Sequence, residues 1–106
     1  FRRSSRGLMD TAISPQESAV IEAVLNADCQ DGIEWHALRT RQSGVRRFVS
    51  VHILVPGGWT IQQGHDLVER IETDICSQIN QCSVFTHLEP IEDPLAFEDQ
   101  SLVRQN

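Results

Sequence analysis

The sequence predicts an α+β fold in which two helices cover one face of a three-stranded sheet. Segments with helical and strand-like patterns follow one another in the order helix, strand, strand, helix, strand, and capping or turn residues separate them. The 106 residues are enough for one domain with a modest core and too few for two. This order is that of a ferredoxin-like α-β-β-α-β sandwich.

The first helix is predicted to begin after Ser14. Ser14 can cap the helix, Pro15 suits the first helical position, and Glu17 can complete a capping box. The residues that follow carry an apolar stripe at three- and four-residue spacing, which comprises Val20, Ile21, Val24 and Leu25. Asp31-Gly32 is expected to end the helix.

Three strands are predicted. Residues 33–41 and 47–55 flank Gln42-Ser43-Gly44, whose turn chemistry indicates a hairpin. The second of these strands is rich in β-branched residues, so we expect it at the centre of the sheet. The third strand is expected at residues 83–89, ending at Pro90.

The second helix follows the break at Pro56-Gly57-Gly58. Thr60 and Gln63 form a second capping box. We expect its apolar stripe to include Ile61, His65, Val68, Ile71, Ile75 and Ile79. A buried imidazole costs free energy unless it finds a partner, so His65 is expected to meet one.

The composition excludes some classes of partner and location. The formal net charge of −6 argues against nucleic acid, which requires a concentrated positive face. No apolar run approaches the roughly 20 residues that span a bilayer, so we expect a soluble domain. Cys29, Cys76 and Cys82 are an odd set without C-x-x-C spacing, which favours a reducing compartment. Cys76 and Cys82 could ligate a metal, although such residues are more often small buried hydrophobes.

The four histidines each fall inside a predicted element. His36 and His52 lie in the first two strands, His65 lies in the second helix, and His87 lies in the last strand. Glu89 follows His87 by two residues, so their side chains share one face. Imidazole nitrogens with a carboxylate oxygen suit zinc and neighbouring divalent ions. The spacing alone forms no metal signature, and the alternative is four unrelated histidines, with His52 and His65 hydrogen-bonded in or near the core.

Several stretches resemble the cytoplasmic C-terminal domain of the cation diffusion facilitator family. They are His36-Ala37-Leu38-Arg39-Thr40-Arg41-Gln42-Ser43-Gly44, Phe48-Val49-Ser50-Val51-His52, Gly64-His65 and Val84-Phe85-Thr86-His87-Leu88-Glu89-Pro90. The resemblance runs in order from about residue 8 to residue 92. The patterns His-x-Leu-Arg-Thr-Arg-x-x-Gly and His-Leu-Glu-Pro together make it specific.

The resemblance implies a function in transport, not catalysis. Family members are dimeric proton-coupled antiporters that export Zn²⁺ and variously Cd²⁺, Co²⁺, Fe²⁺, Ni²⁺ or Mn²⁺ from the cytoplasm. Their C-terminal domain has a metallochaperone-like fold and pairs with a second copy into a V that metal closes. The resemblance assigns metal ligation to His36, His52, His65 and His87, with Glu89 bridging two ions. It also implies that Asp10 pairs with the membrane part of the protein.

The hypothesis from sequence is therefore a metal-sensing regulatory domain on the cytoplasmic face of the cell membrane, within a multi-pass membrane protein. Residues 1–13 are expected to be a juxtamembrane linker, because Arg2, Arg3 and Arg6 fit the positive-inside rule. Residues 14–92 form the dimerising, metal-binding domain, and residues 93–106 an acidic tail expected to be disordered.

Three alternatives remain open at this point. A small-molecule-sensing domain of similar fold would be stabilised by metabolites and not by Zn²⁺. A soluble metallochaperone would normally carry a paired-Cys motif, which this chain lacks. An acylphosphatase-like enzyme would need a phosphate-cradling loop, and the sequence contains none.

Overall fold

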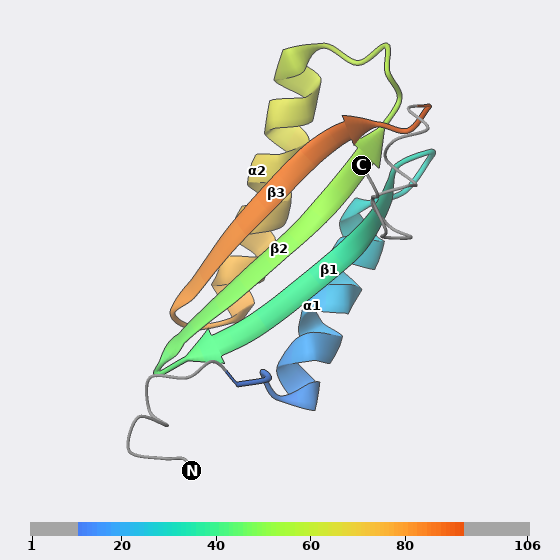
Figure 1. Ribbon diagram of the computed structural model, residues 1–106. Coiled ribbons are helices and arrows are strands. Elements are labelled where there is room, and N and C mark those ends of the chain that lie inside the picture. Colours follow the sequence, from blue (N-terminus) through green and yellow to red (C-terminus); the bar gives the residue numbers. More distant parts are fainter. Residues whose placement is uncertain (1–10, 93–106) are drawn as a thin grey trace, which may run out of the picture.

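The computed structural model describes residues 11–92, and it confirms the predicted order of elements. The chain forms helix α1 (Pro15–Asp28), strands β1 (Glu34–Ser43) and β2 (Arg46–Val55), helix α2 (Ile61–Gln78) and strand β3 (Cys82–Pro90). Both helices lie on the same face of the sheet, so the opposite face carries no helix (Figure 1). Within residues 11–92, no helix combines the length and the apolar character needed to cross a membrane.

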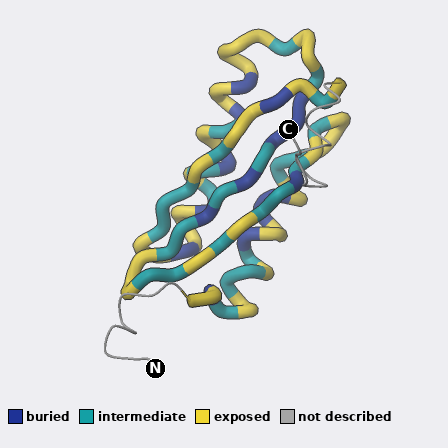
Figure 2. Tube along the Cα trace, in the orientation of Figure 1, coloured by how far each residue is buried: buried dark blue, intermediate teal, exposed yellow. Residues whose placement is uncertain are grey.

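The sheet is mixed, with strand order β1-β2-β3. β1 and β2 form the predicted antiparallel hairpin, while β3 pairs with β2 in parallel after the crossover through α2. β2 is therefore the central strand, as its β-branched residues predicted. Figure 2 shows buried segments along β2, between the two outer strands.

The core lies between the sheet and the helices. Alternate residues of β2 point toward the helices, and they pack on the buried faces of α1 and α2. The fully buried side chains of this layer are Ile21, Leu25, Val49, Val51, Ile53, Ile71 and Ile75. Burying one such aliphatic side chain stabilises the fold by roughly 1.5–3 kcal/mol, so the helices are held mainly by this layer.

The helix starts follow the predicted capping chemistry with one difference. At α2, Thr60 and Gln63 form the complete capping box. At α1, the Ser14 hydroxyl accepts a hydrogen bond from the Glu17 amide at 3.1 Å, but Glu17 does not close the box. Its carboxylate instead pairs with Arg47 on β2, with Nη2 3.1 Å from Oε2. The ion pair to a neighbouring strand therefore replaces the local contact.

The predicted apolar stripe of α2 is wrong in its first turns. Ile61 is 90% exposed, and the buried positions of the helix are Gly64, Leu67, Ile71 and Ile75. Stepping back from Ile71 by four and then by three residues leads to Leu67 and Gly64, which follows the helical repeat of 3.6 residues. The prediction followed His65 and Ile61 instead, which are exposed on the next face round the helix, while Val68 is partly buried against the core as predicted. His65 consequently points away from the core.

Trp35 belongs to the helix-facing side of the sheet. It pairs with Ile53 and packs against the core, and its indole Nε1 donates a hydrogen bond to Asn26 Oδ1 of α1 at 2.9 Å. The indole thus ties β1 to α1 through both an apolar and a polar contact.

Candidate metal centre

Three histidines lie in a row across the open face of the sheet. The register pairs His36 with His52 across the antiparallel strands and His52 with His87 across the parallel strands. Residues directly opposite each other on neighbouring strands have side chains on the same face. Because β2 turns Val51 and Ile53 toward the helices, His52 and the two histidines beside it point to the helix-free face.

A β-bulge follows His36 and sets which face its side chain occupies. His36 pairs with His52 while Arg39 pairs with Ser50, so β1 contains one residue more than β2 in this interval. Ala37 absorbs the extra residue with a φ of 57°. This left-handed conformation costs roughly 1–2 kcal/mol for a residue with a side chain. The bulge lets His36 and Arg39 share one face although three positions separate them.

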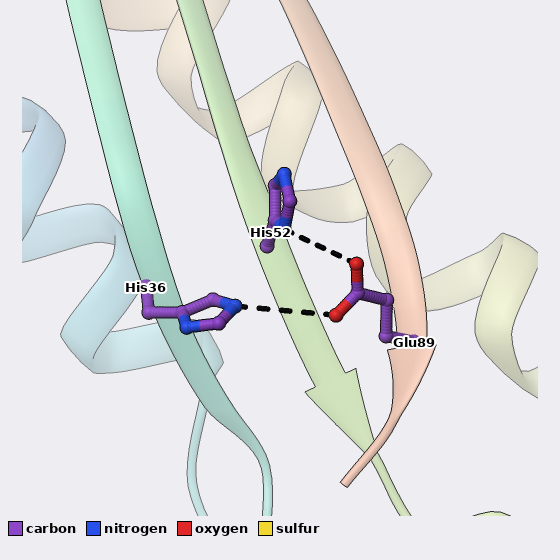
Figure 3. A group of neighbouring side chains, drawn as sticks. All are labelled: His36, His52 and Glu89. Atoms are coloured by element: carbon purple, nitrogen blue, oxygen red, sulfur yellow. Dashed lines mark ion pairs between the residues drawn. The ribbon is translucent and has the colours of Figure 1, made fainter. Parts of the chain in front are cut away.

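Glu89 lies at the meeting point of the histidines, as Figure 3 shows for His36 and His52. Its Oε2 lies 3.2 Å from His52 Nδ1 and 3.3 Å from His87 Nδ1. Its other oxygen, Oε1, lies 4.0 Å from His36 Nε2. The two carboxylate oxygens therefore face different imidazoles.

The imidazole rings contact one another edge to face. The ring centroids of His36 and His52 are 5.2 Å apart, and those of His52 and His87 are 4.8 Å apart. The exposure of the histidine side chains increases from β1 to β3: that of His36 is 6% exposed and that of His87 is 64% exposed. The centre is therefore buried at β1 and opens to solvent at β3.

The chemistry of this cluster fits a divalent metal ion. His36, His52 and Glu89 each offer a ligand atom, and these atoms all lie within 4.8 Å of one another. Buried Nδ1 of His52 and Oε1 of Glu89 make no hydrogen bond within residues 11–92. Leaving such atoms unsatisfied costs about 1–3 kcal/mol each, and a bound cation would satisfy both. Two imidazoles with a carboxylate form an established ligand set for zinc, with His87 beside them as a further nitrogen donor.

His65 does not join this cluster within one chain. Its side chain is 57% exposed on α2, and Nε2 lies 3.7 Å from the Glu69 carboxylate one turn away. The expectation of a buried His65 is therefore wrong, for the helical-face reason given above. Its neighbour Gly64 packs directly on the Leu88 side chain of β3, so α2 starts close to the strand that carries Glu89.

Other residues singled out from the sequence lie outside this centre or outside the described part of the chain. Asp10 and the acidic tail of residues 93–106 lie outside the described residues. Cys76 is exposed and not a buried hydrophobe, while Cys82 and Cys29 are partly buried against the core. Sequence reasoning also missed the bulge at Ala37, because alanine gives no signal for a left-handed backbone.

Comparison with known families gives one description. The family described as "Cation efflux protein, cytoplasmic domain" matches residues 13–91. The match covers every residue that the structure describes except residues 11, 12 and 92.

Curated relatives are transporters. The chain is 43% identical over 98 residues to an uncharacterised transporter of Synechocystis sp., covering 92% of this chain and 32% of that protein. It is 28% identical over 87 residues to the cation-efflux pump FieF of Pectobacterium atrosepticum, covering 81% of this chain and 28% of the pump. The chain thus spans about a third of the length of these relatives.

Solved structures share the fold. A zinc form of the putative zinc transporter CzrB superposes with a TM-score of 0.68 at 29% identity, covering 77% of this chain and 93% of that one. The metal-bound C-terminal domain of the CzcD transporter from Thermotoga maritima gives a TM-score of 0.65 at 23% identity. That match covers 77% of this chain and 99% of the CzcD domain, and it establishes similarity of fold.

Proposed function

Because the chain belongs to the family of cation efflux protein cytoplasmic domains, we propose that it is the metal-sensing regulatory domain of a divalent-cation exporter. The family is one of transporter domains and not of enzymes, as the sequence resemblance implied. The regulated ion is zinc or a neighbouring divalent cation, and the domain works as a homodimer joined to its own membrane part.

The convergence of His36, His52 and Glu89 carries this proposal. These residues come from three different strands, yet their ligand atoms lie within 4.8 Å of one another on the helix-free face. His87 adds a fourth donor beside Glu89. The proposed ligand set is therefore His36, His52, His87 and Glu89, with Glu89 able to bridge two ions through its two oxygens.

His65 is proposed to act across the dimer. It lies exposed on α2, apart from the cluster of its own chain, so an ion on the sheet face can meet it only from a second copy. A ligand shifts an equilibrium between two states only as far as it binds them with different affinity. Ligands drawn from two subunits provide that difference, since only the closed dimer gathers them around the ion.

Relatives support a metal ion as the regulator without identifying it. CzrB is described as a putative zinc transporter with a zinc form, and FieF as a cation-efflux pump. Histidine and carboxylate ligands follow general affinity trends among Zn²⁺, Cd²⁺, Co²⁺, Fe²⁺, Ni²⁺ and Mn²⁺. The ion exported by the whole protein is proposed to belong to this group.

A calorimetric titration of Zn²⁺ into the chain at two pH values tests the proposal. An ordinary imidazole has a pKa of about 6.5 and must lose its proton to bind a metal. We expect binding near pH 7.5 and binding weakened by at least about tenfold near pH 5.5, because more than one imidazole must be deprotonated. His52→Ala should remove the binding at both values. Equal affinity at the two pH values would rule out histidine ligation.

A further inference from the structure

Two cysteine side chains meet at the end of the sheet opposite Glu89. Cys76 lies near the end of α2 and is exposed, while Cys82 is the first residue of β3 and is partly buried. The Cys76 thiol donates a hydrogen bond to the Cys82 carbonyl oxygen, with Sγ 3.3 Å from the oxygen, and it also interacts with the Cys82 side chain. The two sulfur atoms are therefore neighbours, although five residues separate them in sequence.

The turn between the two cysteines is held in place by arginines of β2. Arg47 donates hydrogen bonds to the Gln81 carbonyl through its amide at 2.8 Å and to the Asn80 carbonyl through its guanidinium at 3.3 Å. Arg46 donates to Gln81 Oε1 at 3.3 Å and to the Ser83 hydroxyl. Gln81 adopts a left-handed φ of 53°, which reverses the chain. These contacts fix Cys82 relative to α2 before any ligand arrives.

The ligand count around the thiols selects the type of ion. Within residues 11–92, the group of three or more ligating side chains close enough to share an ion is His36, His52 and Glu89. The described residues therefore give the two thiols no third histidine, cysteine or carboxylate. A structural zinc site requires four ligands, whereas the soft monovalent ion Cu⁺ is selected by thiolates and can be held by two of them.

We infer that Cys76 and Cys82 form a second ion site, which takes a soft monovalent ion such as Cu⁺ between two thiolates. The site is separate from the histidine centre and does not depend on the proposed function. As the two sulfur–metal bonds form, each thiol releases one proton to solvent, and the complex of one Cu⁺ with two thiolates carries a single negative charge.

The local charges suit such a complex. Burial first and the nearby Cys76 second raise the pKa of the Cys82 thiol to about 11, against the lowering effect of Arg46 and Arg47. The protein without the ion thus holds a neutral thiol at Cys82. The two guanidinium groups that favour the thiolate form remain beside it when the ion displaces the proton, and they offset the charge of the complex.

Anaerobic titration of the chain with Cu⁺, supplied as its acetonitrile complex, tests this inference. We expect native mass spectrometry to show a single tightly held Cu⁺ and X-ray absorption to show two-coordinate sulfur ligation. Cys76→Ser and Cys82→Ser should each weaken Cu⁺ binding on the order of 100-fold, because a chelating pair becomes a single thiol. Cys29→Ser is the matched control, since this third thiol lies near Asp28 and Arg70, and it should leave binding unchanged.

A second arm separates this site from the histidine centre. The double variant His36→Ala, His52→Ala should still bind Cu⁺ tightly, and Cys82→Ser should still bind Zn²⁺ as the wild type does. Unchanged Cu⁺ affinity in both serine variants would overturn the inference. So would a wild-type chain that retains no Cu⁺ under anaerobic titration while its thiols stay reduced.

Discussion

Glu89 connects the three histidines of the open sheet face. Its carboxylate is largely buried, and one of its oxygens faces both His52 and His87 while the other faces His36. A buried carboxylate is costly unless charge or hydrogen bonds compensate it. In this chain imidazole groups surround the carboxylate, and imidazole nitrogens are donors that divalent cations accept. A cation therefore gains the most from the one position that all these groups share.

Replacing Glu89 with glutamine tests how much the negative charge of this side chain contributes to metal binding, apart from its size. Glu89→Gln retains the size of the side chain but removes the anionic oxygen, so Zn²⁺ affinity should fall by more than the roughly 10- to 100-fold that loss of a supporting outer-shell group costs. Calorimetry at neutral pH measures the change. Glu22→Gln is the control, because Glu22 is exposed on α1, which lies on the other face of the sheet. An unchanged affinity in Glu89→Gln would exclude the carboxylate as a ligand.

At the scale of elements, the contact between α1 and α2 contains an unfavourable charge. Asp28 ends α1, where the helix dipole disfavours a negative group, and its Oδ2 is buried without a hydrogen bond to any residue from 11 to 92. Burial raises the pKa of this carboxyl above its ordinary value of 3.8, and Asp74 on α2 raises it further. Arg70, with Nε 3.7 Å from Asp28 Oδ1, offsets this only in part.

Asp28→Asn should consequently stabilise the domain at neutral pH. The amide removes the charge and can donate to Asp74, so we expect a gain of about 0.3–1 kcal/mol in the free energy of unfolding. A raised pKa in the folded state means that wild-type Asp28 is most favourable when protonated and loses stability as pH rises through that pKa. The advantage of the variant should therefore shrink as pH falls toward 3.8.

Urea unfolding of both chains across this pH range measures the difference between them. Asp66→Asn serves as the control, because the Asp66 carboxylate is exposed and accepts a hydrogen bond from Gln62 on its own helix. A stability advantage that grew on acidification would contradict the assigned direction of the Asp28 pKa.

At the scale of the whole molecule, local patterns predicted the order and type of every element. The capping residues at Ser14 and Thr60 and the β-branched run of β2 act through neighbouring residues, so sequence alone reports them. Which helical face of α2 is buried depends on packing against β3. The prediction therefore placed His65 wrongly, where Gly64 meets Leu88.

The sequence allowed us to name the residues of the candidate site but not to predict that they lie close together. Ligand chemistry and family resemblance named His36, His52, His87 and Glu89, but their meeting requires the parallel register of β3 on β2 and the bulge at Ala37. Strand register across a helical crossover is a property of the folded chain, since no local signal pairs residues 35 positions apart. Whether His65 joins the site depends on a second copy, which lies beyond any one chain.

Anomalous diffraction at the zinc edge, from crystals grown with Zn²⁺, tests the central claim most directly. The account predicts an ion on the helix-free sheet face, about 2.0–2.2 Å from nitrogen atoms of His36 and His52 and from an oxygen of Glu89. It also predicts that any His65 ligand comes from a second copy. Zinc bound only elsewhere, with these three side chains taking no part in ligation, would contradict it.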